Sequence, residues 1–134
     1  MKKGYIDSNI FLNPILYGDK KAEAYKKILN NIINNGFYAV TSVLTWDEVV
    51  FIIGKKIGRD LAVKEGRKFL AFPNLFFVSV SMDIVLRAQK IIEKYNLKPR
   101  DAIHIATALS QGCNEIVSDD ADFDKVKEIK RVGF

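Results

Sequence analysis

Apolar residues recur along the chain in two kinds of block, and the two kinds alternate. Short runs rich in β-branched and aromatic residues have the length of strands, whereas longer segments repeat apolar side chains every three or four residues, as helices do. The blocks expected to be strands cover residues 4–7, 38–41, 75–80, 115–118 and 129–132. The blocks expected to be helical cover a short turn at 8–12 and longer segments at about 19–33, 45–57, 60–71, 81–95 and 99–112.

Local signals mark the ends of several blocks. Asn13-Pro14 is expected to close the first helical turn, because the residue before a proline avoids the helical conformation. Ser81 can cap the helix that follows it, and Pro99 suits a first helical turn. Trp46 falls on the apolar stripe of its helix, so we expect it in the core rather than stacked on a nucleic-acid base. The continuous apolar run 75–80 predicts a buried strand.

Strands that alternate with helices predict an α/β fold with a parallel sheet covered on both faces. The chain has 134 residues, shows no repeat or low-complexity linker, and is expected to form a single domain over residues 1–134. Open sheets of this kind bind ligands beyond the carboxyl ends of their strands, at the point where the strand order reverses. Polar residues that directly follow a strand are therefore the first candidates for a functional site.

Composition narrows the class of protein. The chain is 49% hydrophobic and 28% charged, which is typical of a soluble globular protein. One cysteine excludes an internal disulfide, and no secretory signal follows the start, so we expect a cytoplasmic protein. The formal net charge of +5 favours polyanionic partners such as nucleic acid.

Carboxylates follow the predicted strands at one end of the sheet. Asp7 ends the first strand, Glu48 lies one helical turn beyond the second, and Asp101 opens the helix before the fourth. The fourth strand is followed directly by Asp119, Asp120 and Asp122. Taken alone, each has a structural explanation as a helix cap, a first-turn anion or a solvated turn residue. Their shared position at one end of the sheet favours a common site.

A cluster of carboxylates needs a counter-charge. Like charges raise one another's pKa and destabilise the fold locally, and a divalent cation reverses that effect. Oxygen ligands select Mg²⁺ or Mn²⁺ rather than zinc or copper. Sites with two such ions typically act on phosphate esters, so the sequence favours a two-metal phosphodiesterase.

Four segments resemble, in the same order, the motifs of PIN-domain nucleases. They are Tyr5–Leu12, Thr41–Val49, Leu97–Leu109 and Ile116–Phe123. The resemblance implies a PIN-like three-layer α/β/α fold with a central parallel sheet of about five strands in the order 3-2-1-4-5. It also implies an endoribonuclease that leaves a 5′-phosphate. Its catalytic and metal-binding acids would be Asp7, Glu48, Asp101 and Asp120, with Asp122 as a further metal ligand and Asn9 and Ser118 as supporting polar residues.

The same resemblance extends to biological role. A short chain of this kind is similar to the VapC-type toxins of toxin–antitoxin pairs, which implies RNA as the substrate, a homodimer and a small antitoxin as partner. Processing of ribosomal RNA and RNA binding without cleavage are alternatives. Lys98 and Arg100 precede Asp101 and are candidates for contacts with RNA phosphates. His104, three residues after Asp101, is expected to be structural, because a metal-activated water needs no histidine base. Asp119 falls on a variable position of the motif and ranks below Asp120.

Overall fold

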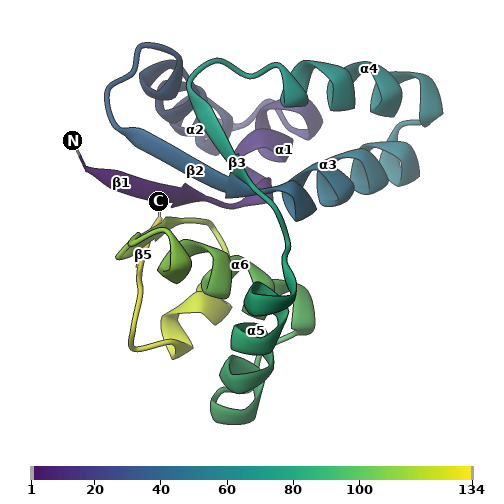
Figure 1. The fold of residues 1–134 in the computed structure, drawn as a ribbon. Helices are drawn as coiled ribbons and strands as arrows, with labels where there is room; N and C mark the ends of the chain where they lie inside the picture. The colour runs from purple at the N-terminus through teal and green to yellow at the C-terminus, as the bar shows by residue number, and fades with distance from the viewer. Residues whose placement is uncertain (1, 134) are drawn as a thin grey trace.

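Five parallel strands form the centre of the molecule, and helices cover both faces of the sheet (Figure 1). The computed structural model describes residues 2–133. The strands are β1 (Lys3–Ile6), β2 (Tyr38–Ser42), β3 (Leu75–Val78), β4 (Glu115–Val117) and β5 (Lys130–Val132). They lie in the order β3-β2-β1-β4-β5, and each neighbouring pair is parallel. The predicted fold class and strand order are confirmed.

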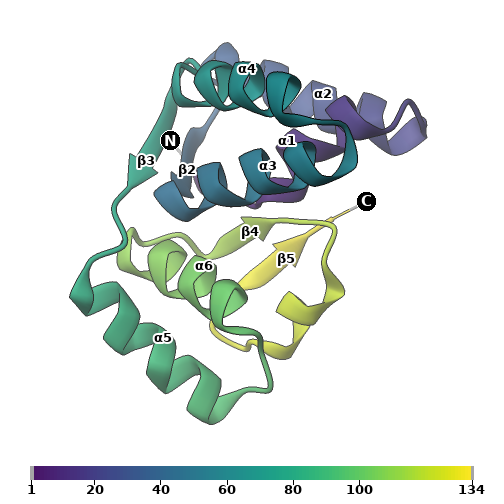
Figure 2. The ribbon, with the colours of Figure 1, turned by 90° about the vertical axis from the view of Figure 1, so that its right-hand side faces the viewer.

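The helices form two layers, one on each side of the sheet. They are α1 (Ser8–Leu16), α2 (Lys20–Ile33), α3 (Val43–Lys56), α4 (Arg59–Leu70), α5 (Met82–Lys94) and α6 (Pro99–Ser110). The first four cover one face, and α5 and α6 cover the other (Figures 1 and 2). A short 3₁₀ helix, η1 (Ala121–Lys125), links β4 to β5. Within residues 2–133, every helix is too short or too polar to cross a bilayer.

Alternation along each strand divides the core into two clusters. Successive side chains of a strand point to opposite faces of the sheet. Tyr5 and Val40 accordingly pack with the buried residues of α5 and α6, whereas their neighbours Ile6 and Ala39 pack with those of α1 to α4. Both faces of the two central strands are therefore apolar, which holds the sheet rigid at the strands that lead to the candidate site.

Helix α1 is longer than its sequence predicts. The expected stop at Asn13-Pro14 is wrong, because the helix continues through Pro14 to Leu16. Proline removes one amide donor from the helix, but Ile15 and Leu16 in the last turn pack against the buried cluster beneath α1 to α4. Burial of these two side chains outweighs the missing hydrogen bond.

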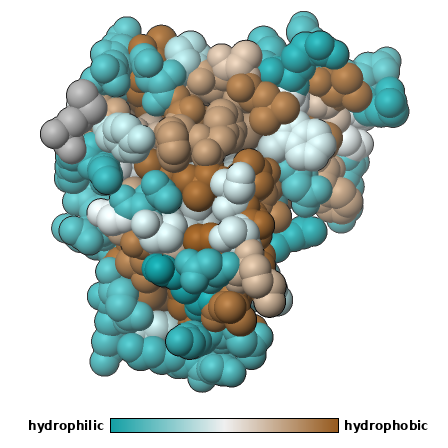
Figure 3. Space-filling model, in the orientation of Figure 1, coloured by the Kyte–Doolittle hydropathy of each residue, from teal (hydrophilic) through white to brown (hydrophobic). Residues whose placement is uncertain are grey.

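Strand β3 and Trp46 are more exposed than predicted. The strand ends at Val78 and lies at the edge of the sheet, where Phe76 is 48% exposed. Val78, on the same side of the strand, packs against the cluster beneath α5 and α6. Apolar side chains gather in the middle of this side of the molecule (Figure 3). Trp46 is 40% exposed. The residues of α3 that turn inward are instead Thr45, Val49 and Ile53.

Trp46 packs over a glycine of the neighbouring helix. A Cβ built on Gly66 of α4 would lie 2.7 Å from Cγ2 of Val50 and 3.2 Å from Nε1 of Trp46. These distances leave no room for a side chain, so Gly66 permits α3 and α4 to approach closely.

We expect Gly66→Ala to lower the free energy of unfolding by about 1–2 kcal/mol, because overpacking outweighs the gain in helix propensity. Denaturation in urea measures the change. Gly18→Ala is the matched control, since a Cβ there would meet no atom within 4 Å. A Gly66→Ala protein as stable as the native chain would show that the two helices can separate without cost.

Candidate functional site

The site lies where β1 and β4 end side by side at the centre of the sheet. These strands are parallel neighbours, and the amide of Asp7 donates to the carbonyl of Val117 at 3.0 Å. Asp7 follows β1 directly and caps α1, accepting a hydrogen bond from the amide of Ser8. Ser118 and Asp120 follow β4, and Asp120 caps η1. Strand pairing thus brings two segments together that lie more than a hundred residues apart in the chain.

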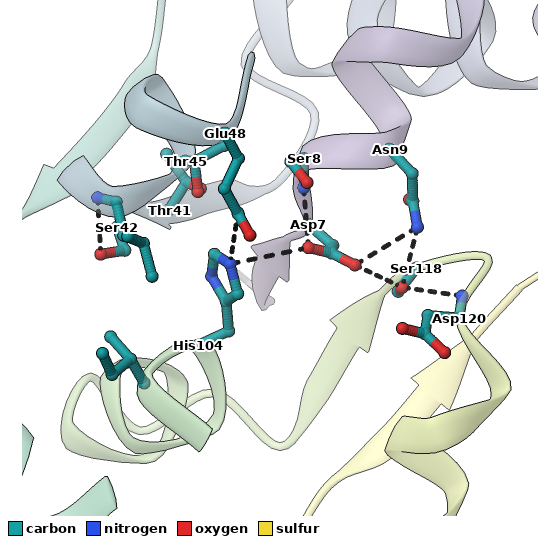
Figure 4. A network of polar contacts seen from close by, with 12 residues as sticks. Asp7, Ser8, Asn9, Thr41, Ser42, Thr45, Glu48, His104, Ser118 and Asp120 are labelled. Carbon is teal, nitrogen blue, oxygen red and sulfur yellow. Dashed lines mark hydrogen bonds and ion pairs between the residues drawn. The ribbon is translucent and has the colours of Figure 1, made fainter. Parts of the chain in front are cut away.

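Ser118 joins these two segments through its side chain (Figure 4). Its hydroxyl donates to Oδ2 of Asp7 at 2.6 Å and accepts from the amide of Asp120 at 3.0 Å. Asn9 donates from Nδ2 to both Asp7 and Ser118, each at 3.3 Å. Asp7 is 6% exposed, and its carboxylate accepts hydrogen bonds from the Ser8 amide and from the side chains of Asn9 and Ser118. Burial raises the pKa of Asp7, although His104 and Ser118 oppose the shift.

Glu48 reaches the same place from α3 and meets the only histidine of the sequence. Nε2 of His104 lies 2.6 Å from Oε1 of Glu48 and 3.9 Å from Oδ1 of Asp7. On the other side of the ring, Nδ1 lies 2.5 Å from the hydroxyl of Tyr5, which also accepts from the amide of Ser42 at 3.2 Å. Burial lowers the pKa of His104, but the hydrogen bond to Glu48 and the charge of Asp7 outweigh it, and the pKa is raised overall.

Asp101, in the first turn of α6, completes the cluster from the opposite layer. One carboxylate oxygen from each of Asp101, Asp120 and Asp122 lies within 4.8 Å of the other two. Burial raises the pKa of Asp101 to about 6, and the negative charges of Asp120 and Asp7 contribute to the increase. Asp101 therefore lies in the electrostatic field of both parts of the cluster.

The structure separates Asp119 from its neighbours in sequence. Its carboxylate pairs with Nζ of Lys21 at 3.1 Å, outside the group that contains Asp120. Lys98 and Arg100 are both exposed at the start of α6, beside Asp101. Arg100 is already within 3.7 Å of Asp47, an exposed carboxylate on α3.

The acids named from the sequence fall into two adjoining groups. One group contains Asp7 and Glu48 together with His104, and the other contains Asp101, Asp120 and Asp122. Each group offers oxygen atoms close enough to share one cation. Asp7 and Asp120 cap α1 and η1 at the ends of β1 and β4, and the other carboxylates come from α3, α6 and η1.

The sequence does not reveal the contacts of His104 with Tyr5 and with Glu48. Tyr5 is two residues before Asp7, and the sequence predicts only that it belongs to the first strand. His104 is predicted to be structural. The available signal was the spacing of Asp101 and His104, which puts both on one face of α6. The partner in α3 is 56 positions away in sequence, and only the folded chain shows it.

Comparison with known proteins identifies the fold family. The model of the PIN domain matches residues 4–129. The chain belongs to the PIN domain family. Among curated proteins, this PIN domain is 26% identical to Ribonuclease VapC6 of Methanocaldococcus jannaschii, and the match covers 94% of each chain.

Solved structures share the same arrangement of elements. VapBC2 of Rickettsia felis, solved with a DNA fragment from the promoter, superposes with a TM-score of 0.76 at 13% identity and covers 98% of both chains. VapC20 of Mycobacterium tuberculosis, described as a toxin that cleaves the sarcin–ricin loop, gives a TM-score of 0.76 at 16% identity. It covers 90% of this PIN domain and 92% of its own chain. At such identities these likenesses establish the fold.

Burial of Asp101 and repulsion from the neighbouring acids predict that the metal-free protein gains stability when this charge is removed. At pH 7.5 native Asp101 is ionised in the folded state at a cost, because its pKa is raised to about 6. We expect Asp101→Asn to raise the free energy of unfolding by about 1–2 kcal/mol in EDTA, after allowance for solvent screening. Below about pH 4, folded Asp101 is already protonated, so this gain should be largely lost.

Urea denaturation at pH 7.5 and pH 4 measures both values. Asp83→Asn on α5 is the matched control, because Asp83 is exposed and, among the described residues, forms an ion pair only with Arg87. It should change stability by less than about 0.5 kcal/mol at pH 7.5. A loss of stability in Asp101→Asn at pH 7.5 would contradict the assignment of unfavourable charge to this position.

Proposed function

We propose that this PIN domain is a divalent-metal-dependent endoribonuclease and the toxin of a VapC-type toxin–antitoxin pair. The observation that carries the proposal is the meeting of Asp7, Glu48, Asp101 and Asp120 at one edge of a PIN fold. The similarity to a curated VapC ribonuclease supports RNA as the substrate. The basic net charge of +5 supports an anionic polymer as the ligand.

The residues present fit a hard divalent cation. Carboxylate oxygens dominate both groups. Burial raises the pKa of Asp7 and Asp101, and a bound cation would stabilise their ionised forms. We assign one ion to Asp7 and Glu48 and a second to Asp101, Asp120 and Asp122. Bound Mg²⁺ or Mn²⁺ supplies activation of water and stabilisation of the charge that develops during phosphodiester hydrolysis.

The protein itself supplies position. Ser118 and Asn9 donate hydrogen bonds to one oxygen of Asp7, and these bonds hold the carboxylate toward the other acids of the cluster. The Ser118 hydroxyl donates to Asp7 and accepts from the Asp120 amide, so it ties the end of β4 to the end of β1. A scissile phosphate placed between the two groups of acids would therefore meet a preformed set of oxygens, and alignment before reaction is a major source of rate enhancement.

Lys98 and Arg100 are proposed to hold RNA phosphates that flank the cut. Both cations are exposed and lie within three residues of Asp101 at the start of α6. The weak pair of Arg100 with Asp47, at 3.7 Å on the surface, leaves the guanidinium available to a phosphate. The positive charges of Lys98 and Arg100 offset the repulsion between the cluster of carboxylates and the RNA backbone.

Cleavage is favoured over RNA binding alone because the four principal carboxylates are all present and close together. A protein that only bound RNA would gain nothing from buried anions, which repel the phosphate backbone. Processing of ribosomal RNA would use the same chemistry and differ only in target. The similarity to VapC proteins favours the toxin over that alternative.

A small antitoxin and a second copy of the chain are the proposed partners. Several structural neighbours are toxin–antitoxin complexes, which supports the antitoxin. An apolar hollow of about 320 Å³ between α1 and α4 offers a place for apolar side chains of a partner. We propose that the homodimer contact uses apolar side chains that are exposed on the surface, among them Trp46 and Phe51 on α3 and Val85 and Leu86 on α5.

Metal-dependent RNA cleavage tests the activity. With Mn²⁺, the purified native protein should cut a mixed RNA pool, and EDTA should stop the reaction. We expect Asp101→Asn and Glu48→Gln each to lower the rate by about 100-fold or more, because each removes a ligand charge. Asp83→Asn, on the exposed face of α5, should cleave like the native protein. Equal cleavage by native and Asp101→Asn proteins would reveal a contaminating nuclease and refute the assigned site.

Salt dependence tests the proposed binding of RNA phosphates. RNA binding is measured in the Asp101→Asn background, so that the ligand stays intact. Adding Lys98→Ala and Arg100→Ala should flatten the plot of log affinity against log salt by about 0.7 for each phosphate that is no longer neutralised. Lys90→Ala, an exposed lysine on α5, is the control and should leave the slope unchanged. An unaltered slope in the double variant would place the RNA backbone elsewhere.

A further inference from the structure

His104 is a fully buried titratable residue that the proposed chemistry does not use. Its ring lies between three elements, with Tyr5 on β1, Glu48 on α3 and its own helix α6. Figure 4 shows the ring between Glu48 and Asp7. Both ring nitrogens are engaged: Nδ1 with the Tyr5 hydroxyl at 2.5 Å and Nε2 with Oε1 of Glu48 at 2.6 Å. A buried ring held at both nitrogens has one orientation.

The directions of these hydrogen bonds follow from the donors available. An ionised Glu48 only accepts, so Nε2 must carry a hydrogen. In the neutral ring Nδ1 is then the acceptor, and the Tyr5 hydroxyl donates to it while accepting from the Ser42 amide. In the charged ring Nδ1 donates to Tyr5 instead, and Nε2 still donates to Glu48. Either form of the ring therefore presents the same N–H to Glu48.

This arrangement differs from that of a metal-binding histidine. A ligand nitrogen must be free of its hydrogen, yet Nε2 needs that hydrogen for the short contact with Glu48. Nδ1 faces Tyr5 and the core, away from the carboxylates. The ring thus lies behind Glu48 as a donor, in the way that outer partners orient the ligands of metal sites.

We propose that His104, anchored by Tyr5, is a positioning residue that holds the Glu48 carboxylate beside Asp7 so that the two acids can bind one cation. Glu48 extends from α3 on three rotatable bonds, and the hydrogen bond to His104 is the contact that restrains its carboxylate in the described residues. Asp7 needs no such partner, because Ser8, Asn9 and Ser118 already restrain it. This inference rests on the proposed function.

A double-mutant cycle on metal binding tests the proposal. Isothermal titration calorimetry with Mn²⁺ alone at pH 7.5 gives the affinity of the native protein, His104→Phe, Glu48→Gln and the double variant. We expect His104→Phe to weaken Mn²⁺ binding about 10-fold in the native background, the scale typical of outer-shell partners. In the Glu48→Gln background the same change should cost less than about 2-fold, because the group that His104 orients is already altered.

His104→Gln provides the conservative rescue, since its amide can donate from near the position of Nε2, and it should retain most of the affinity. Tyr5→Phe is a second test that does not depend on the folding of His104→Phe. It keeps His104 and the volume of the Tyr5 ring but removes the hydroxyl that anchors His104, and it should also weaken Mn²⁺ binding. Tyr95→Phe is its matched control, because that hydroxyl bonds to Glu128 on another part of the surface. Circular dichroism establishes that each variant is folded.

Equal 10-fold losses in both backgrounds would overturn the proposal and make His104 a direct ligand. Unchanged affinity in folded His104→Phe and Tyr5→Phe would overturn it as well, leaving only a core residue. If the native protein binds Mn²⁺ and cleaves RNA but the cycle shows no coupling, the proposed function stands and the positioning role of His104 is refuted. A native protein that binds no Mn²⁺ would refute both.

Discussion

Carboxylates gathered at one edge of a sheet repel one another, and much of the surrounding structure holds them in place against that repulsion. Burial raises the pKa of both Asp7 and Asp101, and the charges of neighbouring acids raise it further. Parallel pairing of β1 with β4, apolar packing on both faces of the sheet and the hydroxyl of Ser118 all oppose the separation of the acids. Packing stabilises the fold in regions remote from the charges, and the fold in turn maintains an arrangement that is locally unfavourable.

Much of this arrangement was visible in the sequence because strand ends are easy to locate. Asp7 and Asp120 directly follow apolar runs of β character, and Asp101 follows a proline that opens a helix. Parallel strands place their carboxyl ends at one edge, so local patterns sufficed to predict that these acids meet. The family resemblance added the strand order, which no local pattern contains.

The errors have a common origin in contacts between distant segments. Pro14 marks a helix end by local rules, but packing of Ile15 and Leu16 extends the helix. Trp46 lies on the apolar stripe of α3, yet it packs over Gly66 of α4 and remains partly exposed, instead of entering the core. The contact of His104 with Glu48 joins helices from opposite layers, so periodicity within either helix gives no sign of it.

The acids come from four segments of one chain, and this has a consequence for the timing of synthesis. Asp7 leaves the ribosome early, but it has no complete set of neighbours until β4 has been made and has paired with β1, since Ser118 follows it by 111 positions. A nascent chain that has been translated only as far as α6 carries Asp7, Glu48 and Asp101 without Asp120. For the proposed ribonuclease, a polypeptide translated only this far therefore has an incomplete set of acids for binding the cations.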